Sequence, residues 1–137
     1  MKPTYKYIDH TADLGIEVYG KNLEELFINI GRAIFETQIF GKVELKTQIK
    51  IEIESESQED LFIDWCRELI YNFSVHGFIP EKYKISIDNL SLKAHLSGDI
   101  FNNKKHKIKT EIKNPTYHNF QLKRTSKHYK ATIIFDI

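Results

Sequence analysis

A cluster of polar residues near the start of the chain has the side-chain types that could bind a ligand or a cation. Two carboxylates, an imidazole and a hydroxyl stand close together there, from Asp9, His10, Thr11 and Asp13. Gly15 follows, and a carboxylate at a strand entrance beside a small residue can face a ligand without crowding. The same residues are typical of a turn, because Asp and Thr side chains readily satisfy nearby backbone groups. On spacing alone, the turn is the preferred interpretation.

A second acidic residue, Asp136, stands at the end of the last expected strand, whereas Asp13 stands at the entrance of an early one. If these strands are neighbours, the two carboxylates and the main-chain carboxylate of Ile137 can meet. Two like charges about 4 Å apart repel by about 4 kcal/mol at an effective dielectric constant of about 20. Such a cluster therefore needs a cation or a proton, and its oxygen ligands favour calcium or magnesium over zinc. The sequence leaves open whether the two strands are neighbours.

A basic stretch in the last third of the chain is the other candidate site. Its members are Lys104, Lys105, His106, Lys107, Lys109, Lys113, Lys123, Arg124, Lys127 and Lys130, with Tyr117, His118 and Tyr129 among them. Lysines interleaved with aromatic rings can hold RNA by phosphate contact and stacking. The alternative is the solvated face of a hairpin, which lysine protects from edge pairing. The hairpin is the preferred interpretation.

The early polar cluster also carries a family resemblance. His10-Thr11-Ala12-Asp13-Leu14-Gly15-Ile16, after an acidic residue and near the start of a chain of this length, resembles the archease family. The resemblance extends to Leu61–Trp65, to Ile112-Lys113 with Thr116-Tyr117-His118, and to Ile134–Ile137. It covers nearly the whole chain, and the early segment is its most specific part.

The resemblance implies a function and a set of site residues. Archeases assist an RtcB-type RNA ligase in tRNA splicing and RNA repair, promoting guanylylation of the ligase and multiple turnover. By this resemblance, Asp13, Asp136 and the Ile137 carboxylate bind a divalent ion, calcium or else magnesium. Lys113 matches a functional lysine of the family, and His10 is expected to support the site rather than bind the ion. RNA is expected to be contacted through the ligase.

Two positions depart from the family pattern. Asn114-Pro115 replaces the usual alanine and apolar residue after Lys113, and proline removes a backbone donor and restricts the residue before it. A bulge or an edge strand is therefore expected there, which affects the direction of Lys113. Asp99 stands where the family often has glutamate.

Two other function classes are open from the sequence. One is a metal-dependent hydrolase of phosphate esters that uses the acidic site with Lys113 as electrophile. The other is an RNA-binding or chaperone-like module that works through the basic stretch. The sequence contains no phosphate-binding glycine loop, nucleophile elbow or zinc-type histidine spacing. We therefore expect a protein that is not itself an enzyme.

The composition sets the remaining bounds. With 41% hydrophobic residues, residues 1–137 are expected to form one domain. The formal net charge of +1 argues against a protein that binds nucleic acid mainly through its overall positive charge. Cys66, the one cysteine, cannot form an internal disulfide and is expected to be buried. No apolar run has the length of a signal peptide or a membrane span, so a cytoplasmic protein without membrane contact is expected.

Two helices and a run of strands must position the candidate sites. Apolar residues at helical spacing from Leu23 to Ile34, after an Asn22 cap, predict the first helix; Gly31 within it is expected at a close crossing. Ser57 and Gly77 bound the second, in which Asp64 and Glu68 are expected on a solvated flank beside Arg67.

Alternation predicts strands at Leu14–Tyr19 and Thr47–Ser55. Five more are expected in the second half: Tyr83–Ile87, Leu90–Leu96, Lys107–Lys113, Thr116–Lys123 and Tyr129–Asp136, with turns that include 97–99. The order of elements predicts an α+β fold, with two helices packed on a mostly antiparallel sheet of about six to seven strands.

Overall fold

The computed structural model describes residues 4–8 and 13–137 of the chain. The described residues form two helices and nine strands. In chain order these are β1 (Tyr5–Ile8), β2 (Leu14–Gly20), α1 (Leu23–Gln38), β3 (Ile39–Phe40), β4 (Thr47–Glu54), α2 (Gln58–His76), β5 (Phe78–Asp88), β6 (Ser91–Ile100), β7 (Lys107–Ile108), β8 (Asn114–Arg124) and β9 (Tyr129–Asp136).

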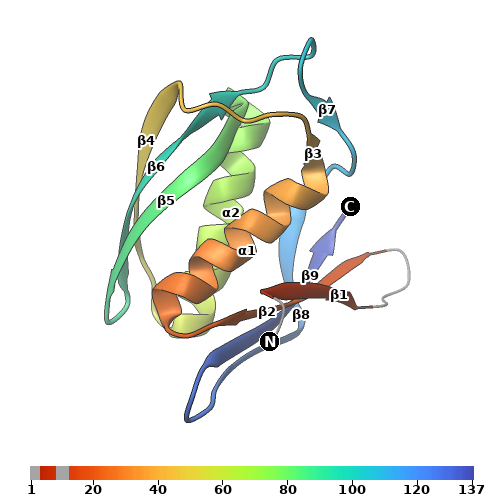
Figure 1. Cartoon of the computed structure of the whole chain (residues 1–137). Coiled ribbons are helices and arrows are strands. Elements are labelled where there is room, and N and C mark those ends of the chain that lie inside the picture. Colours follow the sequence, from red (N-terminus) through yellow and green to blue (C-terminus); the bar gives the residue numbers. More distant parts are fainter. Residues whose placement is uncertain (1–3, 9–12) are drawn as a thin grey trace.

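The strands form three antiparallel sheets. The largest has the order β1-β2-β9-β8, a second has the order β4-β6-β5, and β3 pairs with β7. Helix α1 contacts β2 and β9 of the first sheet and β5 of the second, whereas α2 contacts β8 as well as β4, β5 and β6. Figure 1 shows both helices beside the β4-β6-β5 sheet. The predicted α+β class, with two helices on antiparallel sheet, is confirmed.

Helix α1 forms as its sequence predicts. Asn22 caps it, because the Asn22 side chain accepts a hydrogen bond from the Glu25 N–H at 2.8 Å. Its apolar face is buried in the core, and the predicted close crossing at Gly31 is confirmed. A Cβ atom at Gly31 would lie 2.8 Å from Cε2 of Tyr83 on β5, so only glycine lets the helix approach the sheet this closely.

Helix α2 also has the predicted bounds and carries Trp65, the largest fully buried side chain among the described residues. Ser57 accepts the N-cap hydrogen bond from the Asp60 N–H at 3.0 Å, and Gly77 ends the helix in the left-handed conformation with φ 71°. Trp65 is fully buried, and its indole Nε1–H donates to the Phe27 carbonyl of α1 at 2.9 Å. This contact joins the two helices inside the core. None of the helices among the described residues is long and apolar enough to cross a membrane.

Two predicted elements of the second half are wrong. The expected turn at residues 97–99 lies inside β6, where Gly98 pairs with Pro80 of β5 beside a register shift. Glycine is needed there because a Cβ atom would lie 1.9 Å from the Ile79 carbonyl oxygen. The expected strand Lys107–Lys113 is limited to β7. After Ile108 the backbone turns toward the end of α1, where the Lys109 N–H donates to the Gln38 carbonyl at 2.7 Å.

The close approach at Gly98 gives a stability prediction. Gly98→Ala forces β5 and β6 apart, and we expect it to lower the free energy of unfolding by about 3 kcal/mol, as overpacking does. Urea unfolding followed by circular dichroism measures the loss. Ser97→Ala, one residue earlier on the same strand, is the control and is expected to change little. An equal, small effect of both substitutions would contradict the packing described here.

Candidate functional site

The first candidate site lies at one end of the four-stranded sheet. Strand β2 pairs with β9 so that Leu14 is opposite Phe135. Asp13 precedes Leu14 and Asp136 follows Phe135, so continuing this register by one residue sets the two aspartates opposite each other. Neighbouring strands lie about 4.8 Å apart. The topology thus answers the question that the sequence left open, because the two strands are neighbours in the sheet.

Strand β8 brings Lys113 to the same end of the sheet. Asn114 pairs with Asp136, and the Lys113 N–H donates to the Asp136 carbonyl at 2.8 Å. A bulge or an edge strand was expected at Asn114-Pro115, and the edge strand is confirmed, because β8 is the last strand of its sheet. Its register shift lies farther along, between Thr116 and Gln121. Pro115 itself pairs with Phe135, so proline leaves Lys113 beside the end of β9.

The remaining predicted site residues are Ile137 and His10. Ile137 follows Asp136 and is partly exposed, which leaves the strand end open to solvent. His10, with Asp9, lies outside the described residues. Residues 4–8 and 13–137 contain no group of three or more His, Cys, Asp or Glu side chains that could hold a metal ion. The predicted ligand set is not such a group, because it consists of the side chains of Asp13 and Asp136 and the main-chain carboxylate of Ile137.

The chemistry of this donor set fits a hard divalent cation. All of its predicted ligands are carboxylate oxygens, which calcium and magnesium prefer, and water completes such coordination readily. Asp136 is exposed, and within the described residues its carboxylate forms no ion pair. Two ionised aspartates at adjoining strand ends repel each other. A bound cation removes that repulsion.

A groove of about 800 Å³ adjoins this strand end. The second half of α2 forms one wall, and the irregular segment between β7 and β8 forms the other. The apolar residues that line it are Ile70, Tyr71, Phe73, Phe101, Ile108, Ile112 and Pro115. Lys113 and Asn114 belong to the groove as well as to the strand end, so the two features form one continuous surface.

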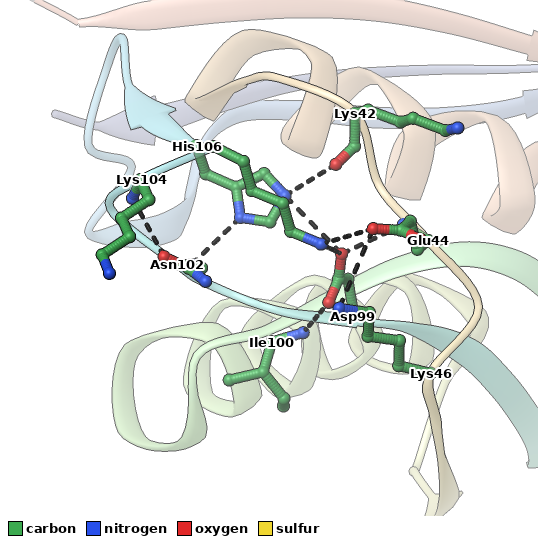
Figure 2. Close-up of polar contacts among 9 residues, drawn as sticks. Lys42, Glu44, Lys46, Asp99, Ile100, Asn102, Lys104 and His106 are labelled. Atoms are coloured by element: carbon green, nitrogen blue, oxygen red, sulfur yellow. Dashed lines mark hydrogen bonds and ion pairs between the residues drawn. The ribbon is translucent and has the colours of Figure 1, made fainter.

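A second polar cluster joins the loop between β3 and β4 to the loop after β6 (Figure 2). Asp99, at the end of β6, is 2% exposed. Its carboxylate accepts hydrogen bonds from the backbone N–H groups of Glu44 at 3.0 Å and of Ile100 at 2.8 Å, and lies 2.7 Å from the Lys105 Nζ. The carboxylate thereby holds together segments that are far apart in the sequence.

The contacts of Asp99 keep its carboxylate ionised. Burial alone would raise the pKa of this group, but the Lys105 ammonium and the two backbone donors outweigh burial and lower the pKa to about 2. The same contact raises the pKa of Lys105 above its usual range. The pair is therefore charged at any physiological pH and acts as a structural clamp.

His106 completes this cluster in its neutral form. The Asn102 N–H donates to Nδ1 at 3.0 Å, which requires that Nδ1 carry no proton. Nε2 then holds the proton and donates to the Lys42 carbonyl at 2.8 Å. His106 is buried, so it fixes the two loops to each other and is not available to a ligand.

These contacts change the interpretation of the basic stretch. Lys105 and His106 do not belong to a solvated hairpin face, because they are bound inside the Asp99 cluster. Lys130 is paired with Glu17 at 2.6 Å, and the Tyr117 hydroxyl donates to Asp60 at 2.6 Å. Four members of the mixture that could have held RNA are therefore engaged within the protein.

Two other expectations are confirmed. Cys66 is buried, and its burial raises the pKa of the thiol, so it is not a reactive nucleophile. Asp64 contacts Arg67 at 2.8 Å on the solvent side of α2 and also accepts from the Ser55 hydroxyl. This carboxylate is part of a surface ion pair and not of a paired-carboxylate site.

Local sequence patterns indicate neither the Asp99 cluster nor the full extent of the groove. The cluster depends on a contact between residues 55 positions apart, which no local spacing indicates. The groove had one sequence signal. Gln38 follows Ile34 by four residues and so continues the apolar face of α1. A polar residue there is unusual on a buried face.

The fold and the site define a small α+β protein in which two aspartates and a lysine share one sheet end beside an apolar groove. The chain belongs to the archease family, because the model of the Archease protein family (MTH1598/TM1083) matches residues 5–137. The resemblance inferred from the sequence is confirmed.

Individual relatives match over nearly their full length. The archease of Sulfolobus acidocaldarius is 34% identical over 136 residues, which cover 97% of this chain and 98% of the relative. The archease of Methanosarcina acetivorans is 34% identical over 139 residues, covering 97% and 95%.

Solved structures agree with the fold. Protein 1598 of Methanobacterium thermoautotrophicum superimposes with a TM-score of 0.85 at 30% identity, covering 98% of this chain and 99% of that one. An archease from Thermotoga maritima, described as a possible chaperone, superimposes with a TM-score of 0.69 at 28% identity, covering 100% and 97%.

Proposed function

We propose that this protein is a non-enzymatic activator of an RtcB-type RNA ligase in tRNA splicing and RNA repair. It promotes guanylylation of the ligase and thereby allows multiple turnover. The observation that supports this most is the meeting of Asp13, Asp136 and Lys113 at one end of one sheet, in a chain of the archease family. These are the residues that the family resemblance selects, and they lie at the ends of three neighbouring strands: Asp13 before β2, Lys113 before β8 and Asp136 at the end of β9.

The proposed metal ligands are Asp13, Asp136 and the Ile137 carboxylate, and the proposed ion is calcium, with magnesium as the alternative. The ion supplies concentrated positive charge at an exposed surface. Asp13 and Asp136 hold it at adjoining strand ends, and the sheet pairing on both sides of β9 fixes the Asp136 backbone. Lys113 adds a second positive charge, directed to the ligase, its nucleotide or its RNA.

The guanylylation step gives a direct test. The RtcB-type ligase from the same source is incubated with labelled GTP, with and without this protein, and covalently labelled ligase is followed over time. We expect faster labelling when this protein is present and no label on this protein itself. Hydrolysis of GTP or of another phosphate ester by this protein alone would instead favour a metal-dependent hydrolase.

Ion binding gives a prediction that needs no ligase. At a free concentration of about 100 times its Kd, calcium is expected to add about 2.7 kcal/mol to the free energy of unfolding and to raise Tm by about 8 °C. The Asp13→Asn variant is expected to lose this increase, and Asp88→Asn, at an exposed strand end elsewhere, is expected to keep it. Thermal unfolding with calcium or EDTA measures the shift. An unchanged increase in Asp13→Asn would contradict the proposed ligand set.

A further inference from the structure

The groove beside the strand end has an exposed apolar lining. Tyr71, on α2, is 52% exposed, and Ile108, on the opposite wall, is 48% exposed. Phe73 and Phe101, in edge-to-face contact with ring centroids 6.1 Å apart, also line the groove. Large apolar side chains that remain exposed around one concave site mark a binding surface more often than an ordinary patch of protein surface.

A buried amide in the wall of the groove has an unsatisfied donor. The Gln38 Oε1 accepts a hydrogen bond from the Ile112 N–H at 3.1 Å, and this bond fixes which end of the amide is oxygen. Nε2 is therefore a donor, and it is buried with no hydrogen-bond partner among the described residues. Buried donors in native proteins are almost always paired. An acceptor that enters the groove, such as a carbonyl oxygen, would satisfy it.

The charge around the groove is mainly positive. Lys113 lines the groove, and the exposed side chains of Lys107 and Lys109 flank the lining residue Ile108 in the sequence. Arg67, on the other wall, is already paired with Asp64. Glu111 is the one carboxylate among the lining residues. A partner that carries carboxylates beside an apolar group would match this arrangement in both charge and polarity.

We propose that the groove binds an extended segment of the partner protein. The segment inserts one bulky apolar side chain between Tyr71 and Ile108, offers a main-chain carbonyl to Gln38, and carries acidic residues that face the lysines. RNA fits the site less well, because half of the lining residues are aliphatic or aromatic, Lys113 is the one lysine among them, and the guanidinium of Arg67 is paired with Asp64. The inference rests on the proposed function, since the segment is taken to belong to the RtcB-type ligase. It adds the contact surface that the acidic strand end does not supply.

The test compares two exposed positions of one helix. Tyr71→Glu places a carboxylate in the groove, whereas Val75→Glu changes a residue that is 56% exposed on the same helix and lies outside the groove lining. Binding of the intact protein to the ligase is measured by titration calorimetry. We expect Tyr71→Glu to weaken binding about 30-fold, as loss of an interface anchor does, and Val75→Glu to leave it unchanged. Ile108→Glu is a second groove variant, expected to act like Tyr71→Glu.

Charge is tested separately. Lys109→Glu is expected to weaken binding about tenfold, and salt is expected to weaken binding of the unmodified protein more than that of the variant. The groove proposal is overturned if the unmodified protein binds the ligase and the groove variants bind equally well, and the proposed function then stands. It is also overturned if Tyr71→Glu weakens binding of RNA but not of the ligase. Failure of the unmodified protein to bind the ligase would overturn both proposals.

Discussion

Asp136→Asn is expected to return the ligase to the turnover that it shows without this protein. Asp136 ends β9, which lies between β2 and β8 in the sheet, and its side chain is a proposed ion ligand. Asparagine has nearly the same shape as aspartate, so the substitution removes the charge without disturbing the strand end. Loss of groups that only support a metal ligand costs about 10–100-fold in affinity, and loss of a ligand itself is expected to cost at least about 100-fold. Calcium titration and RNA ligation with excess substrate measure the two effects.

Asp88→Asn is the matched control for this substitution. Asp88 is also an exposed aspartate at the end of a strand, but it ends β5 at the hairpin that leads to β6. We expect normal calcium affinity and normal stimulation from this variant. If Asp136→Asn loses calcium affinity but still stimulates the ligase fully, the proposed role of the ion is wrong.

Asp99→Ala is expected to lower the free energy of unfolding by about 3 kcal/mol. The substitution leaves the Glu44 and Ile100 N–H groups and the Lys105 ammonium without their acceptor, and loss of one partner from a buried charged pair typically costs about 3–5 kcal/mol. The low end applies because the Lys105 side chain is partly exposed. Glu44→Ala, which removes the exposed partner of Lys105, is expected to cost much less. Urea unfolding measures both.

The Asp99 clamp also predicts a dependence on pH. Its folded-state pKa of about 2 lies below the ordinary value of 3.8, so ionised Asp99 contributes stability that is fully present above pH 3.8. That contribution is lost as the pH falls from 3.8 to about 2, because the unfolded chain binds the proton first. Unfolding curves of the unmodified protein and of Asp99→Ala are expected to converge over this range. A constant difference between them would contradict the assignment.

The helices and most strands could be predicted because their signals are local. Asn22 and Ser57 bond to backbone groups three residues away, and the alternation at Ile49, Ile51 and Ile53 requires only one buried sheet face. The turn expected at 97–99 failed for the opposite reason. Gly98 is required by the backbone of Ile79, across the sheet, and a glycine between polar residues looks like a turn when that neighbour is unknown.

The candidate sites divide in the same way. The sequence supplied the residue types at Asp13 and Asp136, but their nearness depends on strand order, which is a property of the whole fold. The Asp99 cluster could not be predicted because its acceptor and its Glu44 donor are brought together only by packing. The groove is formed by α2 and a segment that departs from the predicted strand, and the polar Gln38 on the apolar face of α1 is its one signal in the sequence.

RNA ligation with substrate in large excess tests the central claim most directly. The RtcB-type ligase from the same source is assayed with no addition, with this protein, and with its Asp13→Ala and Asp136→Ala variants. We predict that only the unmodified protein carries the ligase beyond one turnover. Turnover that is the same with and without the unmodified protein would contradict the proposed function, and full stimulation by both variants would contradict the role given to the acidic strand end.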